Sequence, residues 1–340
     1  MNDAVHESTP RPTEQRSQGG AFVVSLDFEL HWGVRDHEPT GGRYRANLFG
    51  AREAIPQMLA AFARREVAAT WAVVGFLFAA SRDELLAYAP EERPTYAEPR
   101  YDAYREPLGR GEGDDPLHFA PSIVKRIAET PRQELASHTY SHFFCLEAGQ
   151  TLAQFRADLR AARRIAADKG YELRSLVLPR NQLNPAYFDA VREAGFRCLR
   201  GHERSWLYQP RAREDERLTR RAGRLLDAYL DLSGSHATPW GRLGAKGGLV
   251  DVPASRFLRP YSARLAALEP RRLGRIEAAM LEAARRGTIF HLWWHPHNFG
   301  TRTAENMAGL ERILEHYTRL RERFGMRSLS MGEVAGALGD

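Results

Sequence analysis

The sequence is poor in cysteine and lysine, with only Cys145 and Cys198 and three lysines among its 340 residues. Two cysteines in a chain of this length make no disulfide framework, which favours a reducing compartment. No apolar run approaches the roughly 18 residues of a membrane-spanning helix. Residues 1–20 are polar and lack the basic and apolar regions of a secretory signal. These absences predict a cytoplasmic protein with no transmembrane segment and a disordered tail over residues 1–20.

Arginine carries almost all of the positive charge. Lysine and arginine total 49 against 43 acidic residues, which gives a net charge of +6. The arginines are spread through amphipathic segments, which indicates a compositional preference of the genome. A nucleic-acid-binding surface would instead gather them in one patch. We therefore expect no nucleic-acid partner, and a mildly basic surface favours an anionic or phosphate-linked substrate.

Strand-like and helix-like segments alternate from residue 21 to the end of the chain. Short apolar, β-branched runs predict strands, and apolar residues spaced three and four apart predict helices. The expected strands are 21–26, 68–74, 133–136, 173–178, 196–199, 249–252 and 288–295. The expected helices are 47–65, 121–129, 150–169, 184–195, 220–229, 272–286 and 303–324. About seven such units in a single α/β domain over residues 21–340 favour a closed or nearly closed (β/α) barrel.

Two stretches interrupt the alternation. Residues 81–115 carry four prolines and four tyrosines but no clear period. A long loop inside a compact domain is usually functional or disordered. Because aromatic faces suit sugar rings, we predict a substrate-facing lid there, with a partly ordered surface excursion as the alternative. Residues 200–248 are the least regular part of the chain and predict a second insertion.

Two histidines four residues apart, His138 and His142, follow the strand expected at 133–136. On a helical turn both imidazoles would stand on one side and could reach one metal ion. Asp27 and Glu29 end the first strand, and residues two apart face the same side of an extended chain. If one carboxylate binds the metal, the other is free as a general base. A helix cap or a salt bridge is the alternative for the acidic pair.

Further candidates stand at other strand ends. His295 closes the strand expected at 288–295, where an imidazole can protonate a leaving amine, and His297 is the competing candidate. Arg180 follows a strand that ends in proline, where it can hold a carboxylate by two hydrogen bonds. An ordinary surface arginine is the alternative. Six further histidines are expected to be ordinary surface or core residues: His6, His37, His118, His202, His236 and His316.

Four segments occur in a recognisable order: Ser-Leu-Asp-Phe-Glu at 25–29, Ser-His-Thr-Tyr-Ser-His at 137–142, Leu-Pro-Arg-Asn-Gln at 178–182, and Trp-His-Pro-His at 294–297. Together they resemble the polysaccharide deacetylase family, the NodB-homology carbohydrate esterases. The resemblance implies a distorted (β/α) barrel with fewer than eight units. It also implies the roles of six residues: Asp27 as general base, Glu29, His138 and His142 as metal ligands, Arg180 as the residue that orients the base, and His295 as general acid.

The chain also departs from this family pattern. A phenylalanine separates Asp27 from Glu29 where most members have adjacent aspartates, which indicates a subgroup with an Asp-x-acid first motif. In the third motif, polar residues including Asn181 replace the usual aromatic. Trp206 is the best representative of the fourth motif. We take Trp206, His297 and Asn181 as the candidates for substrate binding.

These residues predict a metal-dependent hydrolase that removes an N-acyl group, expected to be N-acetyl, from a sugar. One divalent ion, zinc or else Co²⁺, Ni²⁺, Fe²⁺ or Mn²⁺, would activate a water that attacks the amide, with Asp27 as base and His295 as acid. The expected substrate is a carbohydrate intermediate of surface polysaccharide biosynthesis, nucleotide- or lipid-linked. The alternatives are a non-catalytic glycan-binding or scaffold protein of the same fold, and a hydrolase of a formamido sugar or a cyclic amide.

Overall fold

The computed structural model describes residues 19–203, 205–208, 218–246 and 248–339, so the tail predicted over residues 1–20 lies outside the described residues except for its last two. The strands are β1 (Ala21–Phe28), β2 (Ala69–Val73), β3 (Gln133–Ser137), β4 (Ser175–Leu176), β5 (Cys198–Leu199), β6 (Thr238–Pro239), β7 (Ala245–Lys246), β8 (Leu249–Asp251), β9 (Arg256–Phe257), β10 (Thr288–Trp294) and β11 (Arg327–Leu329). The helices are α1 (Arg45–Arg64), α2 (Arg82–Tyr88), α3 (Pro121–Glu129), α4 (Leu152–Asp168), α5 (Phe188–Glu193), α6 (Leu218–Tyr229), α7 (Glu269–Arg286), α8 (Thr303–Phe324) and α9 (Met331–Gly339).

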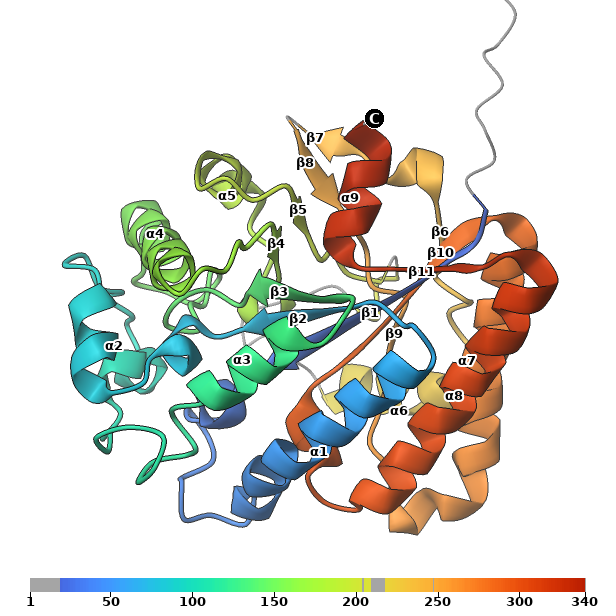
Figure 1. Cartoon of the computed structure of the whole chain (residues 1–340), viewed down its shortest axis with the longest axis horizontal. Helices are drawn as coiled ribbons and strands as arrows, with labels where there is room; N and C mark the ends of the chain where they lie inside the picture. Colours follow the sequence, from blue (N-terminus) through green and yellow to red (C-terminus); the bar gives the residue numbers. More distant parts are fainter. Residues whose placement is uncertain (1–18, 204, 209–217, 247, 340) are drawn as a thin grey trace, which may run out of the picture.

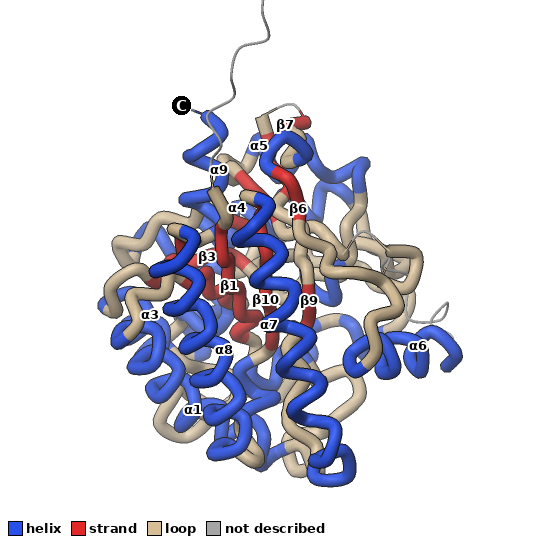
Figure 2. The backbone as a smooth tube through the Cα atoms, turned by 90° about the vertical axis from the view of Figure 1, so that its right-hand side faces the viewer, coloured by secondary structure: helices blue, strands red, loops and turns tan. Residues whose placement is uncertain are grey.

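The sheet curls into an open half-barrel. Its strands follow the order β6-β10-β1-β2-β3-β4-β5-β8-β7, and the seven from β10 to β8 are parallel throughout. The two end strands, β6 and β7, are antiparallel to their neighbours. Figures 1 and 2 show β1, β3 and β10 in the interior, with α1, α3, α7 and α8 along one side of them, whereas β7 lies at the edge of the molecule. Seven parallel strands confirm the predicted distorted (β/α) barrel.

Each of the seven predicted helices has a counterpart in the structure. The counterparts are α1 and α3 to α8. Helices α2 and α9 were not expected. Helix α2 has seven residues, too few to show a period, although Ser81 caps it by accepting a hydrogen bond from the amide of Glu84. None of the described helices is both long and apolar enough to cross a bilayer.

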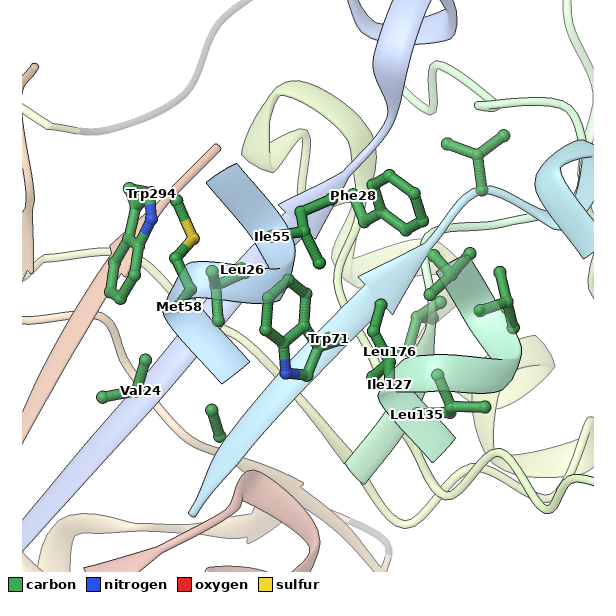
Figure 3. Close-up of a cluster of buried hydrophobic side chains, with 14 of the residues drawn as sticks. Val24, Leu26, Phe28, Ile55, Met58, Trp71, Ile127, Leu135, Leu176 and Trp294 are labelled. Carbon is green, nitrogen blue, oxygen red and sulfur yellow. The ribbon is translucent and has the colours of Figure 1, made fainter. Parts of the chain in front are cut away.

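Strand β1 shows how the sheet presents two different faces. The even-numbered residues 22–28 belong to the large core between sheet and helices, whereas Ala21 and Val23 belong to a smaller inner cluster that α9 fills. Figure 3 shows the outer cluster around Val24, Leu26, Phe28, Trp71 and Trp294. Burying each such side chain stabilises the fold by about 1.5–3 kcal/mol. The same alternation turns Asp27 inward, and Glu29 follows it at the carboxyl end of the strand.

The tyrosines of the excursion at 81–115 are used for packing. The Tyr96 hydroxyl accepts a hydrogen bond from the backbone N–H of Phe144, at 2.8 Å. Tyr101 is 2% exposed, and its ring meets that of Phe144 edge to face. These contacts fix the excursion to the loop that follows β3. The lid function stays a prediction, and Tyr96 and Tyr101 already contact other residues of the protein.

Helix α1 and the turn Pro296–Phe299 approach so closely that only glycine fits between them. A Cβ atom on Gly50 would lie 1.9 Å from the carbonyl oxygen of Gly300, and backbone cannot rotate aside. We expect Gly50→Ala to lower the free energy of unfolding by about 1–3 kcal/mol in urea denaturation. Gly274→Ala in α7 is the matched control, because nothing lies within 4 Å of its added methyl group. Equal stability of the two variants would contradict the packing.

Candidate metal centre

His138 and His142 lie in the loop that follows β3, where the carboxyl ends of the parallel strands converge. The prediction of a helical turn was wrong. Thr139 and His142 have positive φ angles of 63° and 57°, so the segment cannot make helical hydrogen bonds. The loop brings both imidazoles to the same carboxylate by an irregular path.

A buried carboxylate from α4 sets the shape of this loop. Asp158 accepts hydrogen bonds from the backbone amides of Tyr140, at 2.6 Å, and Ser141, at 3.0 Å. Burial raises the pKa of Asp158 to about 6, although these hydrogen bonds and the Ser141 hydroxyl favour the charged form. The charge therefore costs free energy to bury, and its use is to replace the missing helical hydrogen bonds.

Glu29 lies between the two histidines. Its Oε1 is 2.9 Å from His138 Nε2 and 3.1 Å from His142 Nε2, and all three side chains are buried. The three ligand atoms lie within 4.8 Å of one another. Burial would raise the pKa of Glu29, but the facing histidines hold it well below its ordinary value. One carboxylate oxygen and two imidazole nitrogens suit zinc and the other divalent transition metals.

The hydrogen bonds behind the two imidazoles differ. His138 Nδ1 donates to the carbonyl of Val177, at 2.9 Å, as in histidines that bind metals, and its Nε2 faces Glu29, where a cation must lie between the two atoms. His142 Nδ1 lies 3.1 Å from Arg35 Nη1, which can only donate, so its ring proton is on Nε2. With a cation on Nε2, the ring proton would move to Nδ1, which could then no longer accept from Arg35. Arg35 would keep its bond to the carbonyl of Trp32, at 2.8 Å. The donor set fits a metal ion if Arg35 gives up this one contact.

Gly33 provides the space that the Glu29 carboxylate occupies. A Cβ atom on Gly33 would lie 1.8 Å from Oε2 of Glu29 and 2.6 Å from its Cδ. We expect Gly33→Ala to displace the carboxylate and to weaken Zn²⁺ binding about tenfold or more in a calorimetric titration, although no donor atom is lost. Gly41→Ala, where an added methyl group meets nothing within 4 Å, is the control. Unchanged affinity in Gly33→Ala would remove Glu29 from the ligand set.

Asp27 is held by Arg200, which follows β5. The two Asp27 oxygens accept hydrogen bonds from Arg200 at 2.6 and 2.7 Å. Arg200 also donates to Asn181 Oδ1, at 2.8 Å, and its guanidinium lies over the ring of Trp293, at 4.3 Å. Burial would raise the pKa of Asp27, but Arg200, with smaller help from neighbouring histidines, holds it below its ordinary value. Asp27 is therefore ionised and fixed in orientation.

The prediction that Arg180 orients Asp27 was wrong. Arg180 has a φ of 55°, and its guanidinium pairs with Asp36 and, at 3.3 Å, with Glu147, above the ring of Phe144. The left-handed turn takes the side chain away from the strand end. Arg200 occupies the equivalent place one strand along, and the same rule of an arginine after a strand could have found it.

His295 and His297 stack beside the carboxylates. His295 Nε2 lies 3.7 Å from Asp27 Oδ2 and 3.8 Å from Glu29 Oε2, and its side chain is 24% exposed. The ring centroids of His295 and His297 are 4.9 Å apart, and His297 is buried. Burial, with the neighbouring His295, lowers the pKa of His297 to about 3. His295 is thus the more accessible of the two, and with Asp27 and Glu29 it forms a second group compact enough for a metal ion.

The substrate-binding candidates differ in their distance from this chemistry. Asn181 touches Arg200, so it lies in the site as a neighbour of the arginine that holds Asp27. Trp206 is 68% exposed, and its ring lies 5.5 Å from the guanidinium of Arg220. Substrate binding by Trp206, His297 and Asn181 stays a prediction.

Comparison with known proteins gives a family and a fold. Residues 46–199 match the family model for polysaccharide deacetylase. A putative polysaccharide deacetylase from Mycobacterium smegmatis is similar at 15% identity, over 99% of this chain and 94% of the other, with a TM-score of 0.59. A probable polysaccharide deacetylase from Pseudomonas aeruginosa PAO1 is similar at 12% identity, over 93% and 89%, with a TM-score of 0.53. These findings support the polysaccharide deacetylase family.

The fold extends beyond sugar deacetylases. PuuE allantoinase is similar at 12% identity, over 98% of this chain and 97% of the other, with a TM-score of 0.54. No curated protein matches the chain. At these identities the solved structures show the fold, a NodB-type (β/α) barrel. The polysaccharide deacetylase match further supports deacetylation of a sugar as the class of reaction.

Proposed function

We propose that the protein is a metal-dependent hydrolase that removes an N-acyl group, N-acetyl first, from a sugar. The observation that carries the proposal is the grouping of Glu29, His138 and His142 beside an ionised Asp27 and a partly exposed His295, all at the carboxyl ends of the strands. This grouping supports the assignment of three ligands, a base and an acid to one site. The polysaccharide deacetylase match supports the same reaction class.

A divalent cation held by Glu29, His138 and His142, zinc first, would polarise the amide carbonyl and lower the pKa of the attacking water. Asp27 takes a proton from that water, since each of its oxygens keeps a lone pair besides the one that Arg200 uses. His295 gives a proton to the nitrogen that leaves. The products are a free amino sugar and a carboxylate.

We further propose that the substrate is a nucleotide- or lipid-linked sugar, made in the cytoplasm for a surface polysaccharide. The net charge of +6 favours such an anionic substrate. Asp27 and Glu29 flanking Phe28 would place the chain in a subgroup with an Asp-x-acid first motif.

The test is a panel of N-acetyl sugars, N-formyl sugars and a cyclic amide, with the Zn²⁺-loaded protein and detection of the acid released. We expect acetate from the N-acetyl sugars. Turnover of the cyclic amide alone would replace the proposal with the second candidate, which the shared fold of PuuE allantoinase favours. Glycan binding without release of any acid would point to a non-catalytic protein.

A further inference from the structure

A second histidine pair lies next to the candidate metal centre and has no role in the chemistry above. His31 follows Glu29 in the short turn Leu30–Gly33, and His118 lies just before α3. Their rings are 1% and 2% exposed, with His31 Nδ1 2.9 Å from His118 Nε2. A carboxylate oxygen of Glu106 lies within 4.8 Å of both nitrogens. Two buried imidazoles and a half-buried carboxylate thus meet at one point.

The outer nitrogen of each ring faces an oxygen. His31 Nε2 lies 2.8 Å from the carbonyl oxygen of Glu38, and His118 Nδ1 lies 2.9 Å from both carboxylate oxygens of Asp115. Because these oxygens accept hydrogen bonds, the ring protons belong on the outer nitrogens. The two inner nitrogens then face each other with lone pairs, and a cation between them, either a proton or a metal ion, must relieve their repulsion.

We propose that His31, His118 and Glu106 bind a second divalent metal ion, of the zinc class. Glu106 favours the metal over a shared proton: within the described residues its carboxylate has no hydrogen bond or ion pair, and a proton between two nitrogens needs no third ligand. The Glu38 carbonyl and Asp115 are the acceptors that metal-binding imidazoles have behind them.

The two imidazoles require only a small adjustment. Zinc–nitrogen bonds of about 2.0–2.1 Å at tetrahedral angles separate two ligand nitrogens by about 3.3 Å. The inner nitrogens of His31 and His118 are 2.9 Å apart, so the rings must open by about 0.4 Å. Three protein ligands leave one position for water.

The second ion would be structural. His31 and His118 are 87 residues apart in the chain, and the ion would join the turn that carries Gly33 to the excursion that carries Glu106. Trp32 Nε1, in the same turn, already donates a hydrogen bond to the carbonyl of His118, at 3.0 Å. The ion would therefore fix the segment that positions Glu29, and removing it should loosen the first site as well.

The experiment measures how many zinc ions bind to each protein chain. Full-length protein is freed of metal with a chelator and titrated with Zn²⁺ alone, by calorimetry and by elemental analysis after dialysis. We expect two equivalents in the wild type, one in His138→Ala, and none in the double variant His138→Ala/His118→Gln. In the His138→Ala background, Zn²⁺ should still raise the melting temperature, and Glu106→Gln should weaken the remaining site about tenfold or more.

The matched control is Glu112→Gln in the same background. Glu112 lies in the same excursion but pairs with Arg52 outside the cluster, so zinc affinity should not change. One equivalent in the wild type together with none in His138→Ala would overturn the second site and leave the first in place. One equivalent in both, lost on adding His118→Gln, would keep the second site and contradict the first. The two proposals can therefore fail separately.

Discussion

Asp27→Asn is expected to lower kcat for acetate release by about 10²–10⁴-fold, which is what a positioned general base contributes. Asparagine has the shape of aspartate but cannot accept the proton of the attacking water. Asp27 is not a member of the proposed ligand set Glu29, His138 and His142, so the variant should retain its bound zinc. The measurements are initial rates on the best substrate of the panel and metal content of the same sample.

The control is Asp189→Asn on α5, an exposed aspartate paired with Arg192, which removes the same charge far from the chemistry. Its kcat should equal that of the wild type. An Asp27→Asn variant with wild-type kcat and full metal content would refute the role of Asp27 as base. His138→Ala should instead lose both zinc and activity, which separates the ligand from the base.

The fold class could be predicted because hydrophobic periodicity, and with it the alternation of strands and helices, is a local property of the chain. Strand β1 is apolar up to its carboxylates, and α1 and α8 show clear apolar faces, so their bounds agree with the expected ones within a few residues. The two-residue strands β6, β7 and β9 leave no such pattern. Their pairing depends on the neighbouring strand, β10 or β8.

The site was harder to predict because side-chain partners depend on turns. His138 and His142 were identified from their spacing, but for a geometric reason that does not apply, since Asp158 and not helical bonding shapes their loop. Arg180 and Arg200 both follow strands, and the positive φ at Arg180, which the sequence does not reveal, accompanies its pairing with Asp36 and Glu147 instead of Asp27. The partnership of His31 with His118 spans 87 residues and has no sequence signature at all.

Arg200→Met is expected to give the second large effect, a loss of about 3–5 kcal/mol in stability at pH 7, because it leaves the Asp27 charge buried without its partner. The matched control is Arg180→Met, the same change at an arginine that pairs with Asp36 and Glu147 at the edge of the site. Denaturation in urea between pH 4 and 8 measures both variants.

The pH dependence distinguishes a positioning role of Arg200 from a merely structural one. In the wild type the pKa of Asp27 is lower in the folded than in the unfolded chain, so its contribution to stability is present above about pH 4 and is lost as the pH falls. In Arg200→Met, only the smaller contributions of His138 and His295 oppose burial, so we expect that pKa to rise above its unfolded value and stability to fall as the pH rises through it. The acid limb of kcat should move to higher pH with it, because Asp27 must be ionised to accept a proton. Arg180→Met should leave the acid limb in place, and identical profiles for the two variants would show that Arg200 does not govern the base.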